Sequence, residues 1–124
     1  ICYDLRFPEI FQLASPQAEL IVVPANWPED RVGHFKTLLK ARAIENQCYI
    51  AGINRVGHAR TLSYSGDSMI VDPLGNELAH GGREEELLVA DLDLDMVRKY
   101  RETFPAKIDR KPDLYRKLAD GLHI

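Results

Sequence analysis

The sequence lacks the patterns that several classes of function require. Its longest apolar run is about five residues, whereas a membrane-spanning helix needs roughly twenty, so we expect no membrane partner. Basic residues are not in excess either, since 16 Lys and Arg stand against 19 Asp and Glu and are scattered along the chain. The net charge of −3 gives no electrostatic support to nucleic-acid binding.

Cysteine is also scarce. Only Cys2 and Cys48 occur, and their separation fits no zinc site, redox pair or disulfide framework. We therefore expect free thiols, a packed side chain at Cys48, and a reducing, cytoplasmic location. The four histidines form no metal-binding pattern, and no glycine-rich loop follows a predicted strand, so we expect neither a metal ion nor a cofactor.

The chain opens at Ile1, without an initiator methionine, inside what reads as a structural element. With 124 residues and 45% apolar content, it can bury one core. We interpret it as one globular unit that belongs to a longer protein.

Hydrophobic periodicity predicts alternating helices and strands. Helices are expected over 4–14, 31–46 and 94–102, and strands over 19–24, 48–53, 68–71, 76–79 and 86–92. Residues 54–63 read as a polar connection, and Asp93 as the N-cap of the last helix. Because a strand, a helix and a strand follow one another over 19–53, we predict a parallel pair. The fold class is α/β, with helices against a mixed sheet.

Cys2 lies where a strand, extended backward, would meet the first helix. At such a turn, helix N–H groups can stabilise negative charge on sulfur and on an oxyanion. Position alone favours a buried cysteine that packs as a small hydrophobic residue. The residues around Cys2 favour a nucleophile instead.

Several motifs follow one another in order along the chain. They are C-Y-D-L-R-F-P-E at 2–9, P-A-N-W-P at 24–28, A-R-A-I-E-N-Q at 41–47, N-R-V-G at 54–57, Y-S-G-D-S at 64–68, D-P-L-G at 72–75 and Y-R-E-T-F-P at 100–105. This series resembles the nitrilase superfamily of carbon–nitrogen hydrolases, from Cys2 to about Tyr115. The residues in these motifs are similar to those of the omega-amidase-like branch, whose members hydrolyse the side-chain amide of 2-oxo acids such as 2-oxoglutaramate.

The resemblance implies a fold and an assembly. Residues 1–124 would be the C-terminal portion of a single hydrolase domain of the α-β-β-α sandwich type, with a tail over roughly 103–124. Such proteins commonly form homodimers or higher homo-oligomers when full length, and they carry no metal or organic cofactor. The expected partner is a small-molecule amide.

The resemblance also implies a catalytic set of a Glu general base, a Lys that stabilises the oxyanion, and Cys2 as nucleophile. The Glu and the Lys would lie upstream of Cys2, so this chain alone is expected to be inactive. The thiolate would attack the amide carbon, ammonia would leave, and water would cleave the thioester. The backbone N–H of Tyr3 is a second oxyanion donor in this interpretation.

Two further residues are candidates for substrate binding. Asn26 and Trp27 follow a predicted central strand, at the carboxyl end where α/β sheets place ligand contacts. The alternative is a turn asparagine and a tryptophan in the core.

Other polar residues near these motifs read as structural supports. Arg42, Glu45 and Asn46 lie close together on one helix, where a structural contact is the commoner outcome. Arg6 and Glu9 are three residues apart beyond the nucleophile, and an ion pair between them could hold the helix there.

Two alternative functions remain. The chain could be a truncated, noncatalytic scaffold or interaction module, because half of a sandwich exposes the inner face of its sheet. It could also belong to a related branch that acts on nitriles or N-carbamoyl compounds.

Overall fold

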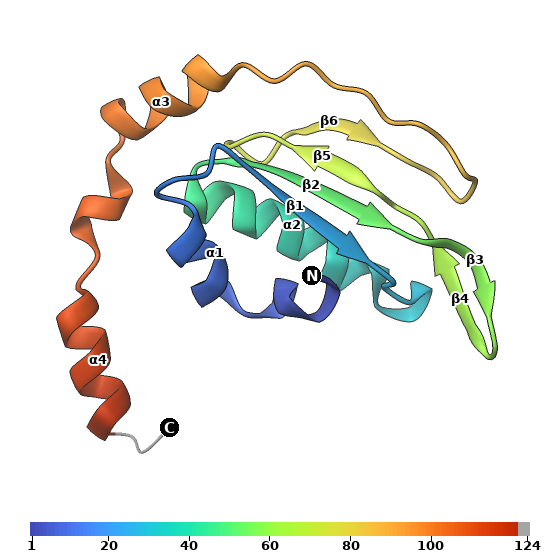
Figure 1. The fold of residues 1–124 in the computed structure, drawn as a ribbon, viewed down its shortest axis with the longest axis horizontal. Helices are drawn as coiled ribbons and strands as arrows, with labels where there is room; N and C mark the ends of the chain where they lie inside the picture. The colour runs from blue at the N-terminus through green and yellow to red at the C-terminus, as the bar shows by residue number, and fades with distance from the viewer. Residues whose placement is uncertain (122–124) are drawn as a thin grey trace.

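The computed structural model describes residues 1–121, and in it helices pack against a four-stranded sheet (Figure 1). The elements are η1 (Cys2–Arg6), α1 (Pro8–Ala14), β1 (Leu20–Ala25), η2 (Glu29–Arg31), α2 (Val32–Asn46), β2 (Tyr49–Asn54), β3 (Val56–Ala59), β4 (Leu62–Ser65), β5 (Met69–Val71), β6 (Glu77–His80), α3 (Leu94–Thr103), η3 (Ala106–Asp109) and α4 (Pro112–Gly121), where η denotes a 3₁₀ helix. Within residues 1–121, no helix combines the length and the apolar character that crossing a membrane requires.

The main sheet has the strand order β1-β2-β5-β6. β1 and β2 are parallel, in a register that sets Leu20 opposite Tyr49 and Ala25 opposite Asn54. The other two pairs are antiparallel. The predicted α/β class and the predicted parallel pair are therefore confirmed.

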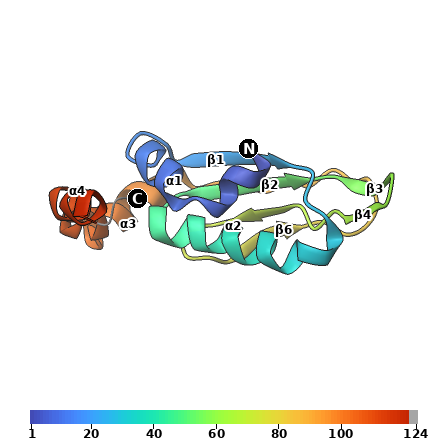
Figure 2. The same cartoon turned by 90° about the horizontal axis from the view of Figure 1, so that it is seen from below.

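The core lies between α2, with η1 and α1 beside it, and one face of the sheet (Figure 2). α2 contributes Phe35, Leu39 and Ala43, all fully buried. They pack with sheet residues such as Ile50 and Met69 in one cluster. Burial of this apolar face, rather than helix propensity, stabilises α2 in place.

α2 approaches β2 most closely at Gly52. A Cβ atom built there would lie 2.8 Å from Leu39 Cδ2 and 3.0 Å from Phe35 Cζ. Only glycine fits at this contact, because both neighbouring side chains are fully buried and have little room to move.

The opposite face of the sheet carries exposed apolar residues. Val22 of β1 and Ile53 of β2 are each about half exposed, at 51% and 54%. On β1, Val23 is buried and its neighbours Val22 and Pro24 are exposed, because successive side chains of a strand point to opposite faces. The described chain therefore leaves much of this second face uncovered, apart from the end at Tyr49, whose hydroxyl contacts Asp93 and Met96 at the start of α3.

α3 and α4 lie beyond the end of the sheet (Figure 1). Arg101 anchors α3, because its guanidinium donates to the carbonyl oxygens of Gln47 (Nε–O 3.0 Å) and Ala18 (Nη2–O 2.8 Å). The predicted N-cap is confirmed, since the Asp93 side chain accepts a 3.2 Å hydrogen bond from the Met96 N–H. In the expected tail over 103–124, residues 122–124 lie outside the described residues.

The first predicted helix, over 4–14, is interrupted. Pro8 cannot donate a backbone hydrogen bond and disfavours helical conformation in the residue before it. Phe7 is accordingly extended, with φ −109° and ψ 103°. The chain therefore forms a short 3₁₀ helix at Cys2–Arg6 and begins the α-helix only at Pro8.

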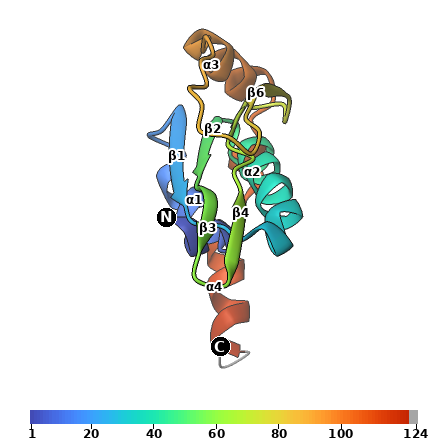
Figure 3. The same cartoon turned by 90° about the vertical axis from the view of Figure 1, so that its right-hand side faces the viewer.

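Two predictions on strands are wrong. Residues 86–92 form no strand, and Leu87 and Val89 are 89% and 77% exposed. Within the described residues this apolar run pairs with neither edge strand of the sheet, β1 or β6. Residues 54–63, read as a connection, instead contribute most of a hairpin of β3 and β4 that projects beyond the sheet (Figure 3). The hairpin is rich in polar side chains, so its sequence does not show the apolar pattern from which strands are predicted.

We predict that Gly52→Ala lowers the free energy of unfolding by about 1–3 kcal/mol, because the added methyl group overpacks the contact with α2. Gly33→Ala is the matched control. It lies in the first turn of α2 with nothing within 4 Å of its Cβ position, so a gain of up to about 1 kcal/mol is expected. Urea unfolding measures both, and equal effects would contradict the close packing at Gly52.

Candidate active site

Cys2 begins η1 in a backbone conformation that is unusual for a residue with a side chain. Its φ is +38°, on the left-handed side where L-residues are strained. The sulfur is half-buried and packs at the edge of the core. The fold thus holds a thiol at a sharp turn, which is typical of a functional position and uncommon for a packing residue.

The amide of Tyr3 is available for another acceptor. The hydrogen bonds of η1 begin with the Asp4 N–H, which donates to the Ile1 carbonyl oxygen at 2.9 Å. The N–H groups of Cys2 and Tyr3 precede this bond, so the helix does not use them. The geometry is compatible with the oxyanion donor expected from the sequence.

Arg42 of α2 fixes the segment that carries Cys2. Its guanidinium donates twice to the Leu5 carbonyl oxygen, from Nε at 3.1 Å and from Nη2 at 2.7 Å. Its Nη1 contacts Glu45 Oε1 at 3.0 Å, and Asn46 Nδ2 donates to the same oxygen at 3.3 Å. The structural role predicted for these helix residues is confirmed.

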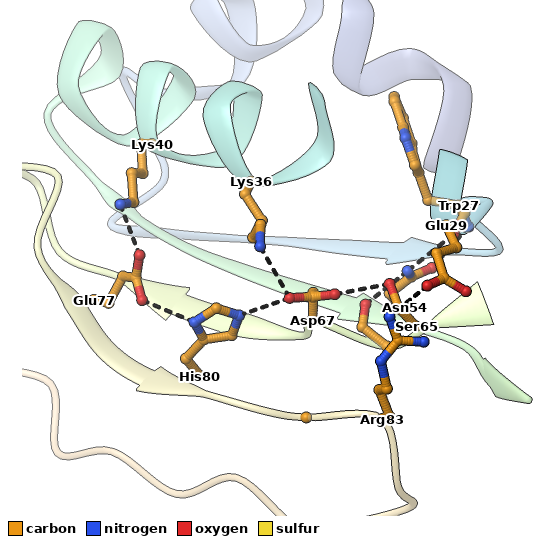
Figure 4. Close-up of polar contacts among 12 residues, drawn as sticks. Trp27, Glu29, Lys36, Lys40, Asn54, Ser65, Asp67, Glu77, His80 and Arg83 are labelled. Atoms are coloured by element: carbon orange, nitrogen blue, oxygen red, sulfur yellow. Dashed lines mark hydrogen bonds and ion pairs between the residues drawn. The ribbon is translucent and has the colours of Figure 1, made fainter. Parts of the chain in front are cut away.

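Asn54, at the end of β2, holds the backbone of Trp27. Its Oδ1 accepts from the Trp27 N–H at 2.7 Å, and its Nδ2 donates to the carbonyl oxygens of Trp27 (3.1 Å) and Gly66 (2.7 Å) (Figure 4). Sequence reasoning gave Asn54 no role in the site. The feature of the sequence that could have indicated this role is the position of Asn54 in the N-R-V-G motif, at the end of a predicted strand.

An open cavity of about 470 Å³ lies beside the nucleophile candidate. The residues that line it come from η1 and from the loop and η2 after β1: Cys2, Tyr3, Arg6, Trp27, Pro28 and Arg31. The structure therefore brings three of the four candidate residues to one place.

The fourth candidate, Asn26, is exposed and does not line this cavity, so its contact with a substrate stays a prediction. Arg6 does not meet the expectation of an ion pair with Glu9. Its guanidinium lies over the Trp27 ring, 4.7 Å from the centroid. This cation–π contact positions Arg6 on the cavity wall.

A separate chain of charges joins α2 to the sheet (Figure 4). Lys40 Nζ contacts Glu77 Oε1 at 2.6 Å, His80 contacts Glu77 at 2.9 Å and Asp67 at 3.1 Å, and Lys36 Nζ contacts Asp67 at 3.1 Å. None of these residues lines the cavity beside Cys2. The network ties the exposed side of α2 to β6.

The surroundings of Asp67 set its protonation. Partial burial alone would raise the pKa of the carboxyl group, but hydrogen bonds from Ser65, Lys36 and His80 outweigh burial, so the pKa lies below its usual value. The Ser65 hydroxyl donates at 2.7 Å. In Glu77, the hydrogen bond from Lys40 lowers the pKa.

Cys48 is more deeply buried than Cys2. It is fully buried in the core cluster, and burial raises the pKa of its thiol to about 11. A neutral thiol in such surroundings is a poor nucleophile. The prediction that Cys48 is a packing residue is confirmed.

Comparison with known proteins gives relatives for the chain. A family model for carbon–nitrogen hydrolases matches residues 1–102. A 2-oxoglutaramate amidase of Bacillus subtilis is 45% identical over 93% of this chain and 45% of its own length. The chain thus spans less than half the length of this relative.

Solved structures match the fold. A CN-hydrolase superfamily protein of Xanthomonas campestris, with an arsenic adduct in its active site, superposes with a TM-score of 0.82 at 36% identity, over 89% of this chain and 44% of that one. A mutant amidase of Nesterenkonia sp. AN1 superposes with a TM-score of 0.76 at 34% identity, over 94% and 41%. That amidase carries the acetamide moiety of fluoroacetamide covalently on its active-site cysteine.

We predict that Arg42→Lys lowers the free energy of unfolding by about 1–3 kcal/mol, because a lysine cannot donate twice to Leu5 while it also contacts Glu45. Arg98→Lys is the matched control. Its guanidinium pairs with Glu19 on the surface, where a change within about 0.5 kcal/mol is expected. Chemical denaturation of both variants measures the difference, and equal losses would show that Arg42 is not the anchor.

We predict that Asp67→Asn reduces the loss of stability in acid. Because the native pKa of Asp67 is lowered, its ionised form stabilises the fold above the unfolded pKa, about 4, and this contribution is lost as the pH falls through the native pKa. Unfolding free energies measured from about pH 6 down to pH 2 should therefore fall less steeply in the variant. Lys36→Met should weaken the dependence in the same direction. Parallel curves for all three proteins would contradict the role of this network.

Proposed function

Because this chain belongs to the carbon–nitrogen hydrolase family, we propose that it carries the nucleophile of an enzyme that hydrolyses small-molecule amides. One observation carries the proposal. Cys2 lies on a strained turn beside the unused Tyr3 amide and at the edge of an open cavity. A nucleophile, an oxyanion donor and space for a substrate therefore meet at one point.

The chemistry follows from these atoms. The Cys2 thiolate attacks the amide carbon, and the Tyr3 N–H donates to the oxygen that becomes negatively charged. The carbon–nitrogen bond then breaks and ammonia leaves with a proton from a general acid. Water attacks the resulting thioester, which releases the acid and restores the thiol. The covalent adduct on the active-site cysteine of the Nesterenkonia amidase supports a bond of this kind.

We place residues 1–124 in the C-terminal portion of a single hydrolase domain. The general base and the oxyanion lysine would then come from residues outside the printed sequence. The shorter length of this chain relative to the B. subtilis amidase supports this, as does the exposed apolar face around Val22 and Ile53, which a second layer would cover. The same face would support the noncatalytic alternative, in which the chain serves as an interaction module. Assembly into a homodimer stays a prediction.

The proposed substrate is the omega-amide of a 2-oxo acid, with 2-oxoglutaramate as the reference compound. The name of the B. subtilis relative and the motifs shared with the omega-amidase-like branch support this choice. Hydrolysis of nitriles or N-carbamoyl compounds in its place would assign the chain to another branch of the family.

We predict that Cys2→Ala in the full-length protein lowers ammonia release from 2-oxoglutaramate by at least about 10³-fold, because Cys2 brings the one thiol that lines the cavity among the described residues. Wild type quenched during turnover should show a mass increase equal to the substrate less ammonia, and the variant should not. Cys48→Ala is the control. Its thiol is buried away from the cavity, so activity per folded molecule should be retained. Full activity in Cys2→Ala would overturn the assignment.

A further inference from the structure

The cavity beside Cys2 has a positively charged wall. Arg6 and Arg31 line it, and among the residues that the structure describes no Asp or Glu does. Three acidic residues are adjacent in sequence to lining residues, namely Asp4 of η1 and Glu29 and Asp30 of η2, and Glu29 pairs with Arg83 (Figure 4). An anionic group that enters the cavity would therefore meet two guanidinium groups and no carboxylate from the lining.

The two arginines differ in how they are held. The Arg6 guanidinium is stacked over Trp27, and this contact positions it against the ring. Within residues 1–121, the Arg31 guanidinium forms an ion pair only with Asp30, its neighbour in sequence, at 3.4 Å, and both side chains are about half exposed or more. An exposed pair of this kind contributes little free energy. A ligand carboxylate can therefore replace Asp30 at small cost.

The backbone of Arg31, in contrast, is fixed. Its carbonyl oxygen accepts a 2.8 Å hydrogen bond from Trp27 Nε1, and its N–H donates to the Pro28 carbonyl oxygen at 3.1 Å. Because Asn54 holds Trp27 in turn, hydrogen bonds tie the backbone of Arg31 to the end of β2. A fixed backbone with an exposed guanidinium is an arrangement suited to binding a ligand.

The start of α2 adds to the positive potential. Arg31 is the N-cap of this 15-residue helix, and the first turn holds no acidic residue. No side chain accepts a capping hydrogen bond there. The partial positive charge of the helix N-terminus is therefore not offset within the helix, next to the Arg31 side chain.

We propose that Arg31 is a specificity-determining residue that binds the carboxylate of the substrate while the amide lies at Cys2. This inference rests on the proposed function and deepens it. The site would take an omega-monoamide of a dicarboxylic acid, since one end must be the reacting amide and the other an anion. The planar guanidinium suits two parallel hydrogen bonds to a carboxylate. Trp27 and Pro28 would contact the methylene chain between them.

A pair of matched substrates tests this in the full-length enzyme. Glutaramate and pentanamide have the same chain length and the same amide, and differ in a carboxylate against a methyl group. Arg31→Gln should lower kcat/KM for glutaramate about 10- to 100-fold, mainly through KM, because a charged hydrogen bond is lost. It should leave kcat/KM for pentanamide nearly unchanged. Arg31→Lys, which keeps the charge but not the planar fork, should fall in between.

Arg116→Gln on the exposed surface of α4 is the control for removal of a positive charge, and it should leave kcat/KM unchanged for both substrates. An equal loss on both substrates with Arg31→Gln would show a structural role, and no loss on glutaramate would show that the carboxylate is not bound there. Either result overturns the inference. A wild type that prefers pentanamide overturns it too, but leaves Cys2 as nucleophile.

A binding measurement separates this inference from the proposed function. Calorimetric titration of glutarate into Cys2→Ala, and into Cys2→Ala combined with Arg31→Gln, requires no turnover. If the double variant binds glutarate at least about 10-fold more weakly than Cys2→Ala does, the role of Arg31 is supported. This holds even if the enzyme hydrolyses no amide, a result that would overturn only the proposed function. Equal affinities, or no binding to either protein, would overturn the inference whatever the activity.

Discussion

The carbonyl oxygen of Leu5 accepts two hydrogen bonds from a single buried guanidinium, that of Arg42. A 3₁₀ helix of five residues has little stability of its own, and Pro8 separates it from α1. The conformation of Cys2 therefore depends on an anchor from elsewhere. Arg42 provides it from the C-terminal half of α2, which is itself held by the core.

Burying a guanidinium is unfavourable unless its hydrogen-bonding groups find partners. Arg42 is 5% exposed, and it reaches one carbonyl oxygen and the carboxylate of Glu45. Its plane also lies over the Phe11 ring, with Cζ 5.4 Å from the centroid, so α1 joins the same contact. One side chain thus fixes α2, η1 and α1 relative to one another. A strained φ at Cys2 can persist because the contacts of Arg42 fix the conformation of the residues that follow it.

Patterns within one element could be read from the sequence, and patterns that need a distant partner could not. The periodicity over 31–46 and the apolar runs around Val23 and Ile50 predicted α2 and the parallel pair correctly, because burial of one face imposes its period on the residues. The run at 86–92 looked like a strand, but pairing depends on an edge that no local pattern reveals. Among the residues of the candidate site, Cys2, Tyr3 and Trp27 were predicted from the sequence motifs that contain them. Arg31 lies outside the quoted motifs, and Asn54 acts through three contacts distant in sequence.

The cavity is therefore held by two supports that do not share a residue. Arg42 fixes η1 from α2, whereas Asn54 fixes Trp27 and, through the indole N–H, the backbone of Arg31. The position of Cys2 depends on the first support and the backbone of Arg31 on the second, and Arg6 of η1 links the two through its contact with the Trp27 ring. The guanidinium of Arg31 takes part in neither support, so a substitution of this side chain should leave Cys2 in place. The role proposed for Arg31 therefore concerns which substrate binds, and it leaves the position of Cys2 unchanged.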